Sequence, residues 1–258
     1  MAVFYWKDLS LLFGARAIAV QTKSFAMDAS CEVLDTTPLS TTGYSECIGG
    51  KKTVTLTFDI MADFTATATE GTTTVYPQKT VSDYLINTGT QGLEARSIVL
   101  GSTVGSTAYL GDSLFTSYTP VEGEPGGLAM GKLACTYSGV VARGQLAHPV
   151  DTARGSSAAG TAIQLGAVSA TQRLYAALHV ANASGTAADQ TLIVKIQSDD
   201  NSSFTSATDR ITFTTASGLT EQITSVAGAI TDDYWRAQWT IAGAGTESFL
   251  FGVTFGVA

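Results

Sequence analysis

The segment from Lys52 to Ile60 carries the strictest pattern in the chain. Apolar residues occupy every second position: Val54, Leu56, Phe58 and Ile60. The positions between them are polar: Thr53, Thr55, Thr57 and Asp59. A period of two places successive side chains on opposite faces of a β-strand. We therefore predict a strand with one dry and one wet face, entered abruptly from a polar loop that ends in Lys51 and Lys52.

Other segments extend this prediction to a mainly β fold. Thr, Val, Ile and aromatic residues recur in short runs, Gly occurs 26 times, and charged residues make up only 14% of the chain. Further strands are expected at 93–101, 106–120 and 131–146, and at 19–34 as two strands around a turn at Asp28 and Ala29. One short helix is expected within residues 80–90, with Ser82 as its N-cap.

A polar stretch of small residues, AHPVDTARGSSAAG, indicates a boundary between two domains. We predict a first domain at 1–150, a linker at 151–160 and a second domain at 161–258. The second domain contains short strand-like segments separated by turn-rich stretches, which is typical of an antiparallel β-sandwich. Trp235 and Trp239 lie four residues apart on one of these segments, so they share a face and are expected in the sandwich core rather than on a sugar-binding surface.

The charge distribution argues against a protein that grips nucleic acid. The net charge is −8, and Lys51 and Lys52 are the only adjacent basic pair. Tight binding to phosphates needs clustered Lys and Arg. An acidic protein can still lie close to DNA if its task is to avoid adhering to it.

Local signatures of catalysis are missing from the sequence, so we expect neither an enzyme nor a cofactor. His148 and His179 have no recognisable partners in sequence, and both are expected at the surface. Cys31, Cys47 and Cys135 are odd in number and share no zinc-type spacing, which favours buried free thiols.

Four acidic residues in two short stretches are candidate metal ligands: Asp199, Asp200, Asp232 and Asp233. Their spacing matches no EF-hand loop, and we favour acidic turn residues without an ion.

The apolar stretch at 9–20 is interrupted by Arg16 and is too short to cross a bilayer, so no membrane anchor is expected. We expect a protein made in the cytoplasm.

Two long segments resemble the major tail tube proteins of long-tailed, siphovirus-like bacteriophages. In ASCEVLDTTPLSTTGYSECIGGKKTVTLTFDIMADF, an LD-T-T strand end leads to a long loop, an aromatic residue, a glycine and an alternating strand that ends in an acidic residue. The segment STAYLGDSLFTSYTPVEGEPGGLAMGKLACTYSGVVARGQLAH is similar to the second half of that domain. The remainder is similar to a sandwich appended to many such tail proteins. The insertion VEGEPGGLAMG and the aromatic amino terminus depart from the family pattern.

The resemblance implies a virion structural protein of the tail, made in the host bacterial cytoplasm. Its fold would be a tail-tube-type β-sandwich or barrel followed by an outward-facing sandwich. Subunits would form rings, usually hexamers, that stack into a tube and join their strands into one inner barrel. Its partners would be further copies of itself, other tail proteins, and DNA that passes through the lumen without specific binding.

The resemblance also implies roles for individual residues. The loop from Thr36 to Gly50 would contact the next ring, and the arm from Met1 to Phe13 could do the same. The loop candidates are Thr37, Thr41, Tyr44, Glu46 and Lys51. The lumen candidates are Thr53, Thr55, Thr57 and Asp59. An alternative is a capsid-decorating or carbohydrate-binding module in which residues 161–258 do the work, and surface aromatic residues would mark that case.

Overall fold

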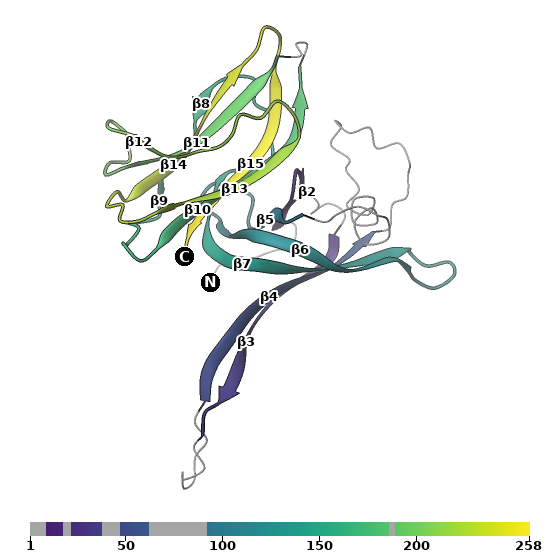
Figure 1. The fold of residues 1–258 in the computed structure, drawn as a ribbon. Coiled ribbons are helices and arrows are strands. Elements are labelled where there is room, and N and C mark those ends of the chain that lie inside the picture. Colours follow the sequence, from purple (N-terminus) through teal and green to yellow (C-terminus); the bar gives the residue numbers. More distant parts are fainter. Residues whose placement is uncertain (1–8, 18–21, 38–46, 62–91, 186–188) are drawn as a thin grey trace.

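The computed structural model describes residues 9–17, 22–37, 47–61, 92–185 and 189–258 (Figure 1). The described residues form two β-sheets with antiparallel pairing and contain no helix. The prediction of a mainly β fold is confirmed. The short helix expected within 80–90 lies outside the described residues. Among these residues, no helix has the length and hydropathy needed to span a membrane.

The larger sheet has ten strands. Its main path runs in the order β13 (Thr220–Ala227), β10 (Arg173–Ser184), β15 (Ser248–Val257), β7 (Met130–His148), β6 (Thr107–Glu122), β5 (Glu94–Leu100), β1 (Leu9–Phe13) and β2 (Arg16–Ala17). Two more strands branch from β7: β4 (Cys47–Met61) and its partner β3 (Thr22–Asp35). The smaller sheet consists of β12 (Thr208–Thr212), β11 (Thr191–Asp199), β14 (Tyr234–Ala242), β8 (Ala158–Ala159) and β9 (Ile163–Gln164).

The carboxyl-terminal half is a β-sandwich. Strands β13, β10 and β15 face the smaller sheet across one large apolar cluster. Trp235 is fully buried and Trp239 nearly so, which confirms their predicted place in the core. The indole nitrogens remain satisfied, because Trp235 donates to the Gly166 carbonyl at 2.9 Å and Trp239 to the Ser156 carbonyl at 3.0 Å.

Strand β7 takes part in both halves of the molecule. Its residues 143–148 pair with β15, whereas its residues 130–136 pair with β4. Between these stretches lies Gly139, whose φ of +82° suits a residue without a side chain. The sheet is therefore continuous across the predicted linker, and β8 lies within that linker. The division into domains at 1–150 and 161–258 stays a prediction.

Strand β4 shows the predicted alternation. Leu56, Phe58 and Ile60 are buried, while Thr57 between them is exposed. The preceding segment differs from expectation, because β3 is one continuous strand and not two strands around a turn. Asp28 and Ala29 remain in register with β4, and this pairing outweighs their turn propensity.

Two further sequence predictions are wrong. His148 and His179 are buried, because protein groups satisfy their ring nitrogens: His148 Nδ1 donates to the Phe251 carbonyl at 3.0 Å. Among the cysteines only Cys135 is buried, whereas Cys31 and Cys47 are exposed on the β3–β4 hairpin. That hairpin projects from the body of the molecule (Figure 1), so its strands lack the covering layer that a buried thiol needs.

Candidate assembly surface

Four strands side by side form the candidate site, which we call the tube sheet. Their order is β6–β7–β4–β3, and the segments involved are 114–122, 130–136, 55–61 and 22–29. Each strand runs antiparallel to its neighbour. The long alternating runs in β4 and β7 favour such pairing, because cross-strand neighbours then share a face.

One face of the tube sheet is apolar and covered. Phe58 lies between Phe25 on β3 and Leu133 on β7, and its ring centroid is 5.1 Å from that of Phe25. Phe13 of β1 meets Phe58 edge-on, with centroids 4.9 Å apart. Leu11 and Ile98 complete the same cluster, so β1 and β5 form the layer that covers this face.

The opposite face is polar. Thr57 lies between Ala26 on β3 and Ala134 on β7. Two parallel rows have the same register. One consists of Asp28, Thr55 and Thr136, and the other of Ser24, Asp59 and Lys132.

Charges on the polar face are partly paired. The Asp59 carboxylate accepts a hydrogen bond of 2.5 Å from the Ser24 hydroxyl. Lys132 forms an ion pair of 2.7 Å with Glu122, and hydrogen bonding to Glu122 raises the pKa of Lys132. Three carboxylates lie on this face, those of Asp28, Asp59 and Glu122. Lys132 and Lys23 oppose them, because Lys23 borders the same pocket as Asp59 and Glu122, so the face has one more negative than positive charge.

Neither edge of the tube sheet pairs with a further strand among the described residues. Strand β3 pairs with β4 and with no other described strand. Strand β6 pairs with β5 only over residues 107–113, so its residues 114–122 have β7 on one side and no described strand on the other. Free edges present rows of backbone donors and acceptors, a template for pairing with another chain.

Three of the four predicted lumen residues, Thr55, Thr57 and Asp59, fall on this surface, and Thr53 precedes them on the same side of β4 within residues 47–54. Thr53, Thr55, Thr57 and Asp59 lie on the polar side of β4, although whether they line a lumen stays a prediction. The sequence did not predict their neighbours on β3 and β7. These neighbours are Ser24, Ala26, Asp28, Lys132, Ala134 and Thr136. Only the pairing register identifies them, and no local signal in the sequence encodes that register.

Beyond the tube sheet, β3 and β4 continue as a two-stranded arm formed by residues 30–35 and 47–54. Isolated two-stranded hairpins are marginally stable in water. The arm nevertheless exposes three apolar side chains: Val33, Leu34 and Ile48. In the described part of the chain these three side chains have no covering layer.

Two of the predicted ring-stacking residues, Thr37 and Lys51, lie on or next to this arm. Lys51 belongs to strand β4 rather than to a loop. Thr37 follows β3 and donates to the Asp35 carboxylate through its backbone N–H at 2.9 Å and its hydroxyl at 2.5 Å. These bonds hold the pKa of Asp35 below its usual value. Thr41, Tyr44 and Glu46 lie outside the described residues.

A buried Ser–His pair is the nearest approach to catalytic chemistry. His179 Nδ1 donates to the Gly14 carbonyl at 2.7 Å, and its Nε2 accepts from Ser97 Oγ at 2.9 Å. Burial lowers the pKa of His179 to about 4, so the ring is neutral near pH 7. Thr254 contacts Ser97 at 2.7 Å and completes the chain of bonds. Ser97 and His179 have no exposed surface, so a substrate cannot reach them, and the group instead links β5, β10 and β15.

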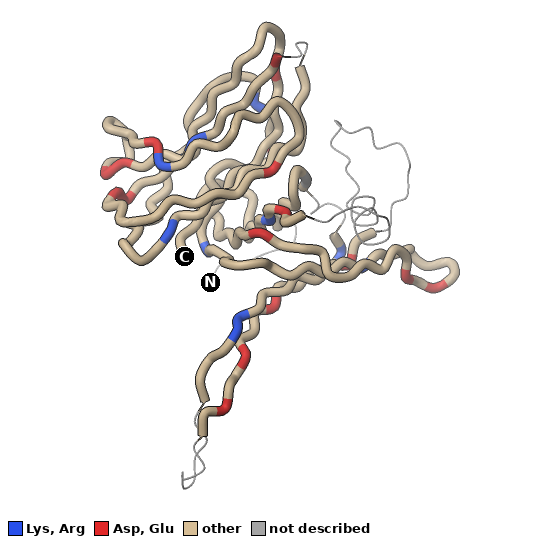
Figure 2. Tube along the Cα trace, in the orientation of Figure 1, with Lys and Arg blue, Asp and Glu red and all other residues tan. Residues whose placement is uncertain are grey.

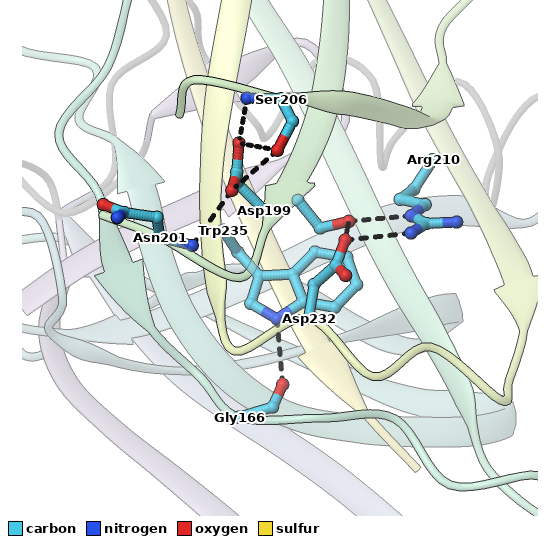
Figure 3. Close-up of polar contacts among 8 residues, drawn as sticks. Gly166, Asp199, Asn201, Ser206, Arg210, Asp232 and Trp235 are labelled. Atoms are coloured by element: carbon cyan, nitrogen blue, oxygen red, sulfur yellow. Dashed lines mark hydrogen bonds and ion pairs between the residues drawn. The ribbon is translucent and has the colours of Figure 1, made fainter. Parts of the chain in front are cut away.

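Two of the four acidic candidates for metal binding, Asp199 and Asp232, have protein partners (Figure 3). Asp199 accepts hydrogen bonds from the backbone N–H groups of Asn201 at 2.9 Å and Ser206 at 2.7 Å. Asp232 pairs with Arg210 at 2.9 Å. Among the described residues no cluster of His, Cys, Asp or Glu has the arrangement of a metal site. These carboxylates organise the turns at one end of the sandwich.

Comparison with known proteins gives matches in solved structures alone. No protein-family model and no curated protein matches the chain. A chain of the virion of the native gene transfer agent particle is 16% identical, with a TM-score of 0.39 over 55% of this chain and 98% of that one. A chain of the anti-feeding prophage baseplate is 10% identical, with a TM-score of 0.40 over 55% and 95%. The Dit protein of phage SPP1 is 8% identical, with a TM-score of 0.36 over 97% and 99%. All three TM-scores lie below 0.5.

Proposed function

We propose that this chain is a structural protein of a phage tail whose copies join their tube sheets into a ring, and that such rings form the tube through which DNA passes. One observation carries the proposal. The tube sheet has a polar face, a covered apolar face and two outer strands that pair with no further described strand. The sequence resemblance to tail tube proteins agrees with it.

Strand direction makes the two edges compatible. Strands alternate in direction along β3, β4, β7 and β6, so β6 of one copy would lie antiparallel to β3 of the next. A contact between two different edges is heterologous and closes into a ring when the rotation between copies allows it. Closure removes every free edge and with it the tendency to aggregate.

The size of such a ring suits its proposed task. Six copies, the number that the resemblance implies, would supply about 24 strands at roughly 4.8 Å spacing, and with a tilt near 40° the backbone cylinder would be roughly 48 Å across. Side chains that point inward from opposite sides of the cylinder narrow this bore. The remaining diameter still exceeds the width of a DNA duplex. The apolar face, already covered by β1 and β5, would face outward.

Chemistry of the polar face suits a conduit. Threonine hydroxyls and small side chains present hydration without a binding site, and the surplus of carboxylates repels phosphates weakly. Lys132 on this face is paired with Glu122, which limits its attraction for DNA.

Hydrogen exchange tests the assignment of the edges. Assembly should slow amide exchange in peptides that cover residues 22–29 of β3 and 114–122 of β6. Strand β11 already has a partner on each side, β12 and β14, so its exchange should not change and it serves as the internal control. Exchange at both edges that is equally fast in monomers and assemblies would refute the pairing.

Reversing a bore charge tests the conduit. Asp28→Lys places a cation on the polar face beside Thr55 and should slow DNA ejection from assembled particles. Asp233→Lys makes the same charge change on the exposed surface of the sandwich and should leave ejection unchanged. Equal ejection rates for the two variants would contradict the proposed role of the bore charge.

The carbohydrate-binding alternative gains no support. Sugar-binding modules commonly present aromatic side chains, and in the described part of the chain no Trp, Tyr or Phe is exposed.

A further inference from the structure

The hairpin that joins β6 to β7 ends in a rigid acidic tip. Gly127 N–H donates to the Glu124 carbonyl at 2.9 Å, and Gly126 has a φ of +86°. With Pro125 before this glycine, the geometry is that of a type II turn. We call residues 121–129 the hairpin tip. Because the turn is fixed in advance, the tip loses little conformational entropy when it docks.

Side chains on the hairpin tip are unsuited to a free surface. Val121 is 55% exposed and Leu128 is 59% exposed. The tip contains Glu122 and Glu124 and no basic residue. Glu122 is paired with Lys132, whereas Glu124 makes no ion pair in the described part of the chain. The tip therefore exposes two apolar side chains beside the carboxylate of Glu124, which makes no ion pair with a described residue.

A groove opens where β4 separates from β7. The ladder between them ends at Thr55 and Thr136, after which β4 continues into the arm and β7 turns toward β15. The space between them is about 850 Å³, and its lining includes Lys51, Lys52, Val54, Leu114, Val140 and Val141. We call this the fork groove. A cavity of this size accommodates a handful of side chains.

The fork groove is complementary to the hairpin tip. Lys51 and Lys52 make no ion pair within the described part of the chain, and no carboxylate lines the groove. Val140 on its wall is 46% exposed. A positive, partly apolar groove thus matches a negative, partly apolar tip. Complementary charge of this kind fixes partner and register.

The two features lie at opposite ends of the tube sheet. The fork groove adjoins the pair Thr55 and Thr136, whereas the hairpin tip follows the pair Met61 and Met130. Six steps along the ladder separate these ends, roughly 20 Å. Figure 1 shows the β6–β7 hairpin and the arm leaving the tube sheet in different directions, and Figure 2 shows acidic residues at the hairpin tip and basic residues at the base of the arm. One copy cannot join its own tip to its own groove.

We infer that the hairpin tip of one copy docks in the fork groove of a second copy in the adjacent ring. The inference rests on the proposed ring. A contact between opposite ends of identical molecules is heterologous, and where the rotation between copies does not close it generates an open, polar stack of rings rather than a pair. It also gives a role to the insertion VEGEPGGLAMG, which the rest of the fold leaves without one.

Single and double charge-reversal variants test this contact. Electron microscopy of the purified full-length protein shows whether each variant forms stacked tubes or single rings. Lys52→Glu and Glu124→Lys should each abolish stacked tubes while leaving single rings, because like charges then meet in the groove. The double variant Lys52→Glu/Glu124→Lys should restore tubes. Asp233→Lys is the control for net charge and should stack as the native protein does.

Cross-linking gives a second readout that does not depend on charge. In a Cys31→Ser/Cys47→Ser background, Val140→Cys together with Leu128→Cys should produce a ladder of linked chains under a mild oxidant, and neither single cysteine variant should do so. Tubes that persist in both charge variants, a double variant that does not stack, or a missing ladder in assembled tubes would overturn the inference and leave the rings in place. A native protein that forms no rings would overturn the proposed function instead.

Discussion

Removing the carboxylate of Glu94 should destabilise the fold far more than its partial exposure suggests. Arg96 is fully buried under the tube sheet, with its guanidinium 4.0 Å from the centroid of the Phe115 ring and 4.6 Å from that of Phe13. Among the described residues, Arg96 forms an ion pair with Glu94, and 3.2 Å separate the guanidinium nitrogen from the carboxylate oxygen. Glu94→Gln keeps the shape of the side chain and leaves a buried cation without its counter-charge.

The expected cost follows from the burial of the pair. Breaking a buried ion pair at one partner costs about 3–5 kcal/mol, whereas replacing the whole pair by apolar groups is often close to neutral. Glu94→Gln should therefore lower the free energy of unfolding by about 3–5 kcal/mol. Arg96→Met added to it should recover most of that loss, because no unpaired charge then remains. The exposed pair of Lys132 and Glu122 is the matched control, and Lys132→Met should leave the urea midpoint close to that of the native protein, because solvent screens an exposed pair.

Urea denaturation of dilute, unassembled protein measures these differences, with tryptophan fluorescence as the signal. The order of stability should be native, Lys132→Met, the double variant and then Glu94→Gln. A Glu94→Gln midpoint that coincides with that of Lys132→Met would refute the argument. It would mean that the Phe13 and Phe115 rings and Cys135, and not Glu94, compensate the charge of Arg96.

Three further changes test the packing. Lowering the pH from 7 to 4.5 should cost about 2 kcal/mol at His179, because the unfolded chain takes up a proton below pH 6.5 and the folded one only near its pKa of about 4; His179→Gln should flatten that part of a urea-midpoint profile, and an unchanged slope would refute the claim. Gly144→Ala should lower the melting temperature by overpacking worth about 1–3 kcal/mol, since the new Cβ would meet the Phe255 carbonyl across the β7–β15 ladder; an unchanged melting temperature would count against the close strand contact. Trp235→Phe should cost about 1 kcal/mol in urea unfolding through loss of the bond to Gly166, and a gain in stability would contradict it.

Much of the fold could be predicted from the period-two pattern. The strand at 52–60, the three strands between 93 and 146, and the sandwich core around Trp235 and Trp239 all match the structure. In each of these segments, the alternation of apolar and polar residues predicts which face of the strand is buried.

The failures share a physical cause. Whether Asp28 and Ala29 turn or continue depends on their partners Thr55 and Val54, and whether His179 is buried depends on Ser97 and Gly14. Long-range pairing decides such cases, and no local pattern reports it. The same limit concealed Asp28 and Lys132 among the candidate bore residues and the free edges of β3 and β6.

The most direct test of the account is a cryo-electron microscopy reconstruction of the assembled protein. The account predicts a hollow cylinder in which residues 114–122 of each copy pair antiparallel with residues 22–29 of its neighbour, and in which Thr57 faces the bore. A particle whose copies meet through their sandwiches, with the β3 and β6 edges still unpaired and no channel, would contradict it.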